Sequence, residues 1–386
     1  MTLRPIYSTP FFMRFQIGML LLFCTFTAKA QILLKEAWKL EIAPNIGYHF
    51  ASNPIAKTGA NMSGYTSGIE VNWVQQGLPE GSWRAYYGTP YLGFGARLTQ
   101  LNNTDTFGYS LALLPFYTLP IFCKEKNYLG IKIGYGLNLN NEVYHREKNF
   151  DNRAISSMVN FSLDVGLKYY HHFNNNHSLS IGTGLYHVSN GSLKKPNGGL
   201  NVVSLQMGYL FSLSKNQVQT KRKQTQYGKD FIRNWEYRIA AALAYRQLGD
   251  VDNVVDFPVF GITQQWLRNI NRLYATGLAL DSWFDPSQAL LSGGNIYQVA
   301  SVRTEKKLQF GLGWYNKFTI GRIFLPLSVH HYLPSSFRII DPVYIKFGAG
   351  YETQKRLFFG LFFKGSINSN KQLESDFMEW ALGYKF

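Results

Sequence analysis

Residues 129–138 read Leu-Gly-Ile-Lys-Ile-Gly-Tyr-Gly-Leu-Asn, and this stretch decides the fold. Every second residue from Leu129 to Leu137 is apolar or aromatic. The residues between them are glycines and Lys132, and Asn138 continues this second series. Successive side chains of a β-strand point to opposite faces, so the stretch predicts a strand with one apolar face. The other face, with glycines and an isolated charge, is typical of the lumen of a membrane barrel.

Residues 159–169 repeat the pattern, with apolar residues alternating with Asn160, Ser162, Asp164, Gly166 and Lys168. Inward charges such as Lys132 and Asp164 could serve a channel or a proton site. A satisfied interior network of polar groups is the more common reason for such charges, and we favour it.

The alternation continues along the chain and predicts an all-β protein of about sixteen strands. Aromatic residues make up 16% of the sequence and glycines number 35, a composition that suits many short strands. After residue 31 no stretch reaches the ~18 to 20 apolar residues that a membrane helix needs, so a membrane location requires a closed barrel. The first eight strands are expected near residues 38–50, 65–76, 86–100, 107–122, 128–140, 157–172, 178–193 and 200–213.

The first thirty residues are typical of a cleavable signal peptide. Arg4 and Arg14 precede the apolar run at 17–26, and Ala28-Lys29-Ala30 is a cleavage signal before Gln31. An exported barrel of this kind is expected in the bacterial outer membrane. The formal net charge of +16 favours anionic partners, which in that membrane are lipid phosphates rather than nucleic acid.

The mature chain divides into two similar halves, residues 31–213 and 235–386, joined by a basic segment at 214–234 that we interpret as a periplasmic linker. Residues 207–211 match residues 382–386 at the ends of the two halves, which indicates a diverged repeat. The halves could close as one barrel or as two tandem barrels of eight strands. Gly-rich inward faces favour two narrow barrels, but two barrels in one chain are rarer, so we slightly favour one.

The hairpin at 184–201, G-L-Y-H-V-S-N-G-S-L-K-K-P-N-G-G-L-N, carries the residues that suggest chemistry. Strand parity places His187 and Ser189 together on the lipid face, near the outer end of a rising strand, and sends Asn201 of the returning strand outward beside them. Residues i and i+2 of a strand lie roughly 6.5 to 7 Å apart, so the histidine could act as a base for a serine nucleophile. Both could also simply lie in the headgroup zone, where polar side chains carry little cost, so the pattern alone leaves catalysis open.

H-V-S-N at 187–190, followed by K-K-P-N-G-G-L-N at 194–201, resembles the motif region of the PagL-type lipid A 3-O-deacylases, also grouped as acyloxyacyl hydrolases. Members of that family are eight-stranded outer-membrane barrels that cleave an ester-linked acyl chain from lipid A in the outer leaflet. The resemblance covers roughly residues 31–213. It implies a serine esterase that acts on the lipid A of lipopolysaccharide.

The resemblance also implies roles for single residues. Ser189 corresponds to the nucleophile and His187 to the general base, with Asn190 and Asn197 near the oxyanion. The family uses a Glu to orient the histidine, and its position falls on Asn201. An asparagine can hold an imidazole by a hydrogen bond but cannot offset its positive charge, so we expect a working but slower site.

Lys194 and Lys195 lie in the adjacent loop, where they could pair with lipid A phosphates or be ordinary solvated lysines. No cofactor and no metal are expected. Cys123 is the single cysteine after the signal peptide, and in each of the pairs at 171–172 and 330–331 the two histidines point to opposite strand faces.

The second half lacks the dyad. Phe363 aligns with His187, Gly365 falls near Ser189, and Asp376 aligns with Asn201, so this copy is expected to be inert. Lys364 and Ser366 form a Ser/Lys pair there, which we interpret as ordinary surface residues.

The main alternative is a non-catalytic barrel, either a channel or a structural protein that keeps a relic of the motif. The missing Glu and the duplicated half favour it. The expected partners are lipid A or lipopolysaccharide, other outer-membrane lipids, and the barrel-assembly machinery, which the alternating aromatic strand ending at Phe386 would engage.

Overall fold

The computed structural model describes residues 38–51, 62–75, 90–212, 233–248, 255–288, 307–333, 342–367 and 373–386. The predicted signal peptide and nearly all of the predicted linker lie outside these residues. Within them, the chain has no helix with the length and apolar character needed to cross a membrane.

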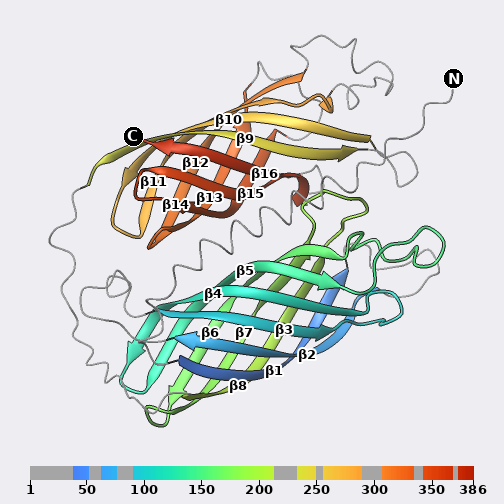
Figure 1. Cartoon of the computed structure of the whole chain (residues 1–386), viewed down its shortest axis with the longest axis vertical. Helices are drawn as coiled ribbons and strands as arrows, with labels where there is room; N and C mark the ends of the chain where they lie inside the picture. The colour runs from blue at the N-terminus through green and yellow to red at the C-terminus, as the bar shows by residue number, and fades with distance from the viewer. Residues whose placement is uncertain are drawn as a thin grey trace.

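The first eight strands close into one antiparallel barrel, in which each strand pairs with its neighbours in the chain and β8 pairs back onto β1 (Figure 1). Their bounds lie close to those expected from the alternation. They are β1 Trp38–Ala51, β2 Gly64–Gln75, β3 Tyr91–Gln100, β4 Tyr109–Lys124, β5 Asn127–Asn140, β6 Val159–His172, β7 His177–Ser189 and β8 Leu200–Ser212.

The other eight strands close into a second barrel beside the first, with β16 pairing back onto β9 (Figure 1). They are β9 Trp235–Leu248, β10 Val255–Asn269, β11 Tyr274–Phe284, β12 Leu308–Ile320, β13 Ile323–Tyr332, β14 Val343–Glu352, β15 Leu357–Ile367 and β16 Leu373–Lys385.

The strands therefore form two barrels of eight and not the single barrel that we slightly favoured from the sequence. The inward side chains explain the difference, because they meet across a narrow lumen. A Cβ added to Gly93, for example, would lie 2.3 Å from the ring of Phe116, so the glycine leaves the room that this ring occupies. Rows of inward glycines thus fit a small radius.

Buried ion pairs fill the middle of the first lumen. Lys132 Nζ lies 2.9 Å from Asp164 and is also hydrogen-bonded to Glu70, and Lys168 Nζ lies 2.8 Å from Glu41. All five side chains are buried. The interior ion-pair network that we favoured for Lys132 and Asp164 is present, although Oε2 of Glu70 has no hydrogen-bond partner among the described residues.

The second lumen is filled in the same way. Lys346 Nζ lies 3.2 Å from Asp281 and 2.9 Å from Glu379, and the hydroxyl of Tyr344 donates to Asp281 over 2.9 Å. Removing one partner of such a buried pair typically costs about 3–5 kcal/mol, because the other charge is left without compensation. The lumens are therefore packed interiors.

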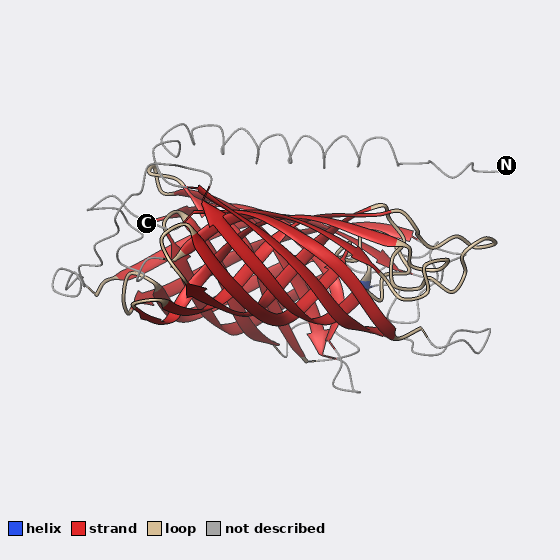
Figure 2. Cartoon of the chain, turned by 90° about the horizontal axis from the view of Figure 1, so that it is seen from below, coloured by secondary structure: helices blue, strands red, loops and turns tan. Residues whose placement is uncertain are grey.

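The outward faces of both barrels are apolar, as a lipid environment requires. On β7 and β8, Leu185, Val203, Leu205 and Met207 are each between 45% and 57% exposed. The strands run obliquely around the barrel, as Figure 2 shows.

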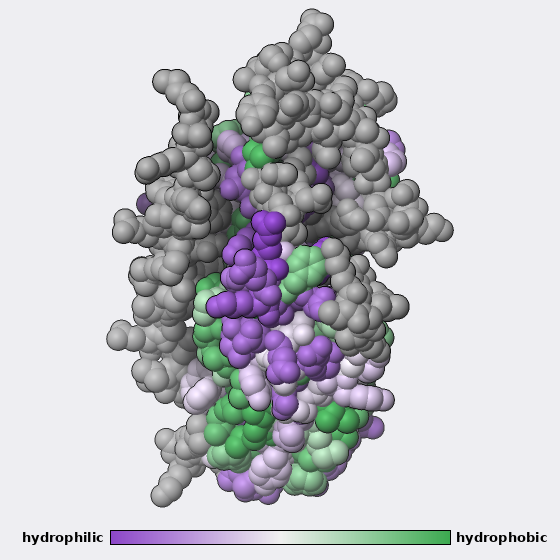
Figure 3. Space-filling model, turned by 90° about the vertical axis from the view of Figure 1, so that its right-hand side faces the viewer, coloured by the Kyte–Doolittle hydropathy of each residue, from purple (hydrophilic) through white to green (hydrophobic). Residues whose placement is uncertain are grey.

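The two ends of the molecule differ. Turns of a few residues, such as 125–126 and 173–176, lie at one end, and longer segments such as 141–158 and 190–199 lie at the other. Figure 3 views the end with the longer loops, where hydrophilic residues gather in the middle of the described surface and hydrophobic residues flank them. Short periplasmic turns and long outer loops are the usual arrangement of outer-membrane barrels, so the strand ends that carry the longer loops face outward.

Candidate active site

His187 and Asn201 lie directly opposite each other on neighbouring strands, β7 and β8. The Nδ1 of His187 is 2.7 Å from Oδ1 of Asn201, so a proton on Nδ1 is donated to the amide oxygen. The neutral ring then carries no proton on Nε2, which is the form that a general base requires. The cross-strand pairing predicted from parity thus brings these two side chains together.

Ser189 is the last residue of β7 and is only 7% exposed. Its Oγ accepts two hydrogen bonds of 3.0 Å, one from the backbone N–H of Gly191 and one from Nδ2 of Asn197. Among the described residues His187 is not one of its hydrogen-bond partners. The two accepted bonds fix the serine oxygen and leave its own proton available to a base. A hydrogen bond between a serine and a histidine base often forms only when substrate is bound.

The two asparagines of the motif have different places. Asn197 contacts the serine, and its Oδ1 accepts the backbone N–H of Asn190 over 3.1 Å. The side-chain amide of Asn190 instead donates to Ser156 Oγ over 3.1 Å and to the carbonyl of Lys194 over 2.8 Å. Asn190 therefore shapes the loop, and its side-chain amide is directed to Ser156 and Lys194 rather than to Ser189.

Two glycines give the loop its path after β7. Gly191 and Gly199 have φ angles of +65° and +74°, a region that other residues adopt only with strain. A Cβ on Gly199 would lie 2.8 Å from Cε1 of His187, so this glycine also allows the loop to approach the imidazole. The left-handed turn at Gly191 ends the strand four residues earlier than the predicted residue 193.

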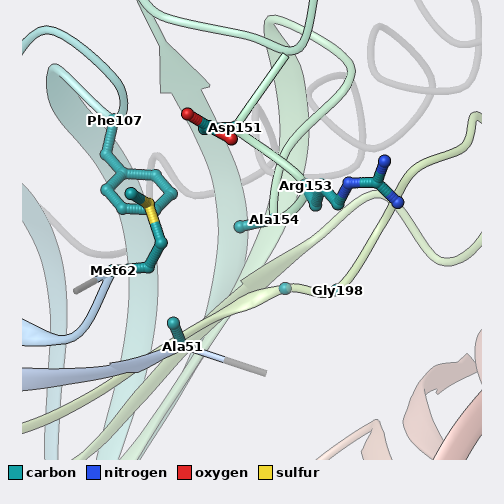
Figure 4. A pocket seen from close by; sticks show the side chains of 8 residues that line it. Ala51, Met62, Phe107, Asp151, Arg153, Ala154 and Gly198 are labelled. Atoms are coloured by element: carbon teal, nitrogen blue, oxygen red, sulfur yellow. The ribbon is translucent and has the colours of Figure 1, made fainter. Parts of the chain in front are cut away.

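The loop between β5 and β6 supports the hairpin at the outer end of the barrel. The backbone N–H groups of Gly198 and Gly199 donate to the carbonyls of Arg153 and Ala154, each over 3.0 Å. Figure 4 shows the small pocket that these segments border together with Met62 and other residues. Its volume of about 20 Å³ suits about one water molecule, so a larger ligand does not fit there.

Residues 67–210 match the family model described as lipid A 3-O-deacylase (PagL), and residues 235–386 match the model described as acyloxyacyl hydrolase, C-terminal domain. Each of the two barrels thus matches a model of the PagL family. With these matches and its two antiparallel barrels, the chain is an outer-membrane protein. No curated relative matches the sequence.

Solved structures match this chain with low sequence identity and low TM-scores. The outer membrane enzyme PagL is 20% identical, with 44% of this chain and 97% of that chain covered and a TM-score of 0.32. The toluene transporter TbuX of Ralstonia pickettii is 8% identical over 91% of this chain and 89% of its own, with a TM-score of 0.19. A mutant of the Rh. blastica porin is 10% identical over 90% and 100%, also with a TM-score of 0.19.

The lysines of the motif loop differ in exposure. Lys194 is exposed at the outer end of the hairpin, whereas Lys195 is half-buried. The backbone N–H of Lys195 donates to Oε1 of Gln247, at the outer end of β9 in the second barrel, over 2.5 Å. The PagL-type hairpin is thus tied to the neighbouring barrel.

The second hairpin, β15 and β16, has no His/Ser/Asn arrangement. Phe363 occupies the outward position that aligns with His187. Lys364 and Ser366 are buried in the lumen, not on the surface as we expected, and both are hydrogen-bonded to Asp376 Oδ2, over 2.8 Å and 2.6 Å. The strands shift register here, and Asp376 is the extra residue on β16.

Sequence reasoning missed several residues around the PagL-family motif. Gly191 was part of the quoted stretch, and a Gly after the last strand residue could have indicated the donor N–H. Ser156 and Gln247 come from other loops and strands, and nothing in their local sequence indicates that they hold this hairpin.

Proposed function

We propose that this protein is an outer-membrane serine esterase that removes an ester-linked acyl chain from lipid A. Ser189 is the nucleophile, His187 the general base, and Asn201 the positioning residue for the imidazole. The observation that carries the proposal is the hairpin geometry. Asn201 holds Nδ1 of the histidine at 2.7 Å, and two residues along the same face the serine oxygen receives two donors at 3.0 Å.

In the first half of the reaction, Ser189 Oγ attacks the ester carbonyl carbon and His187 Nε2 takes its proton. The negative charge that develops on the carbonyl oxygen is stabilised by the donors next to the serine, the N–H of Gly191 and Nδ2 of Asn197. The carbon–oxygen bond to the sugar then breaks. The proton from His187 goes to the sugar oxygen, and an acyl-enzyme remains.

In the second half, water attacks the acyl-enzyme while His187 accepts its proton. The proton returns to Ser189 Oγ as the fatty acid leaves. Because Asn201 is neutral, it stabilises the imidazolium less than a carboxylate would, and we expect a lower turnover than a Glu at this position would give.

The location of the site supports a lipid substrate. Ser189 lies at the outer end of a lipid-facing strand, at the depth where lipids of the outer leaflet hold their ester groups. The exposed ammonium group of Lys194 lies in the same loop, where it can pair with a lipid A phosphate.

The alternative of a channel has less support. A conducting lumen needs an open aqueous path, whereas buried ion pairs such as Lys132–Asp164 and Lys346–Glu379 fill both lumens at mid-height. A purely structural barrel is the remaining alternative and would leave lipid A unchanged.

The test is mass spectrometry of lipid A after incubation with the refolded full chain and with Ser189→Ala. We expect the wild type to remove one acyl chain. The rate of Ser189→Ala should be lower by about 10⁴-fold or more, because the nucleophile and the base act together and neither replaces the other.

Ser67→Ala is the matched control, since Ser67 is exposed on the outward face of β2 and lies in the other half of the barrel wall. It should cleave at the wild-type rate. Unchanged lipid A with the wild type would contradict the proposal, as would equal activity in Ser189→Ala.

A further inference from the structure

The lipid-facing surface next to the serine is aromatic. Phe161 on β6 is the register partner of Ser189, and Tyr135 on β5 stacks on it with ring centroids 6.2 Å apart and planes 4° apart. Unlike the outward residues of β8, both rings are only half-exposed. Something other than lipid therefore covers this part of the first barrel.

The second barrel provides that cover. Phe363, on the outward face of β15, meets the rings of Tyr135 and Phe161 edge-on at 6.2 and 6.3 Å. Met378 on β16 also points outward but is fully buried. Leu382, four residues further along the same outward face, is 62% exposed. We refer to the contact of Tyr135, Phe161 and Gly191 with Phe363 and Met378 as the seam.

The seam reaches the nucleophile. A Cβ added to Gly191 would lie 2.9 Å from Cε1 of Phe363 and 3.0 Å from Cβ of Met378. Gly191 is the residue whose N–H donates to Ser189 Oγ. The second barrel thus packs directly against the loop that holds the serine oxygen.

The seam also contains a polar group without a protein partner. The hydroxyl of Tyr135 is buried and, among the described residues, has no hydrogen-bond partner. A buried hydroxyl without a partner costs free energy, and a polar group of a ligand beside it would supply the missing bond.

We propose that the second barrel forms one wall of the acyl-chain site, so that the substrate's acyl chain lies along the exposed edge of the seam, where half-exposed Phe161 and Phe363 line its path. Phe363 then determines which chains are accepted. The inference rests on the proposed esterase function. An ester held at Ser189 must direct its acyl chain inward along the lipid face, past Phe161. On that path the chain meets the first barrel on one side and the second barrel on the other.

This assignment gives the inert repeat a function. Phe363 stands where the first barrel has its histidine, and an apolar ring there contributes contact area for hydrocarbon rather than proton transfer. Each methylene gained or lost in an apolar site typically changes specificity by roughly 10- to 200-fold.

The test measures kcat/KM of the refolded full chain for p-nitrophenyl esters from short to long acyl chains. Phe363→Ala enlarges the seam and should raise the ratio of long-chain to short-chain kcat/KM by about 10-fold. Phe363→Trp narrows the seam and should lower this ratio. Opposite changes in two variants separate selection of the chain from a general loss of folded protein.

Phe260→Ala is the matched control, because Phe260 is an outward phenylalanine of the same barrel that is 52% exposed. It should keep the wild-type ratio. An active wild type whose ratio does not change in either Phe363 variant would overturn the seam proposal and leave the esterase standing. A wild type inactive on every ester and on lipid A would overturn both.

Discussion

The hairpins β7/β8 and β15/β16 hold equivalent places in the two barrels, yet their polar residues lie on opposite sides of the wall. In the first hairpin His187 and Asn201 meet on the outward face. In the second, Asp376 is the extra residue of an irregular pairing and bonds to Lys364 and Ser366 inside the lumen. One additional residue in a strand is enough to move a side chain to the other face.

The comparison indicates that the barrel itself does not determine the chemistry. Both barrels have the same strand number, antiparallel order and packed lumen. What differs is which face receives the polar groups at the outer end of one hairpin. The first barrel directs them to the lipid, and the second uses them to stabilise its interior.

The largest effect is expected when one residue of the second hairpin is introduced at the equivalent position of the first. His187→Phe places the residue found at position 363 in the catalytic position, and loss of the base should lower lipid A deacylation by about 10⁴-fold or more. The barrel should still fold, since a phenylalanine is tolerated at the equivalent place. Mass spectrometry gives the rate, and circular dichroism checks the strand content.

Activity close to wild type in His187→Phe would show that the two hairpins do not differ in the way that we infer. Leu185→Phe serves as the control for His187→Phe and should keep the wild-type rate. Leu185 lies two residues before His187 on the same lipid-facing side of β7, and it is 45% exposed.

The next test concerns the lumen of the second barrel. Asp376→Ala leaves Lys364 and Arg246 without the carboxylate that lies 2.8 Å and 3.2 Å from them. We expect the free energy of unfolding of the second barrel to fall by about 3–5 kcal/mol, measured by urea titration of the refolded full chain.

Asp256→Ala provides the contrast, because Asp256 is exposed and its partner is the amide of Gln247. It should cost no more than about 1 kcal/mol. Equal effects of the two substitutions would mean that Asp376 is not the buried structural group that its contacts indicate.

The smallest effect is expected at Asn201. Asn201→Ala removes the bond to His187 Nδ1 and should lower kcat by about 10-fold with little change in KM, since the residue positions the base without contacting the substrate. Asn201→Glu should raise kcat above the wild type.

The pair of substitutions at position 201 distinguishes positioning from structure. Loss of kcat in both variants would point to a structural role for the asparagine, whereas no change in either would remove it from the mechanism altogether.

Much of the fold follows from the alternation of side chains. The period of two is long and regular in stretches such as 129–138, so strand positions and the outward placement of His187 could be predicted. The same parity brought Asn201 across from the histidine. The inward charges were also interpretable, since isolated charges in a narrow lumen must pair.

Alternation alone could not give the number of barrels, because it looks the same whether β8 closes on β1 or continues into β9. The Gly-rich inward faces were the one signal that favoured two barrels. The seam was hidden for a similar reason. An outward Phe161 or Phe363 has the same sequence pattern whether lipid or protein covers it. Loops have no parity, so the direction of the Asn190 amide, toward Ser156 and away from Ser189, left no signal.

The charged side chains that fill both lumens have a consequence for the cell that carries this protein. We expect a membrane to hold many copies of such barrels without becoming more permeable, because ion pairs occupy the part of each lumen where a pore would have water.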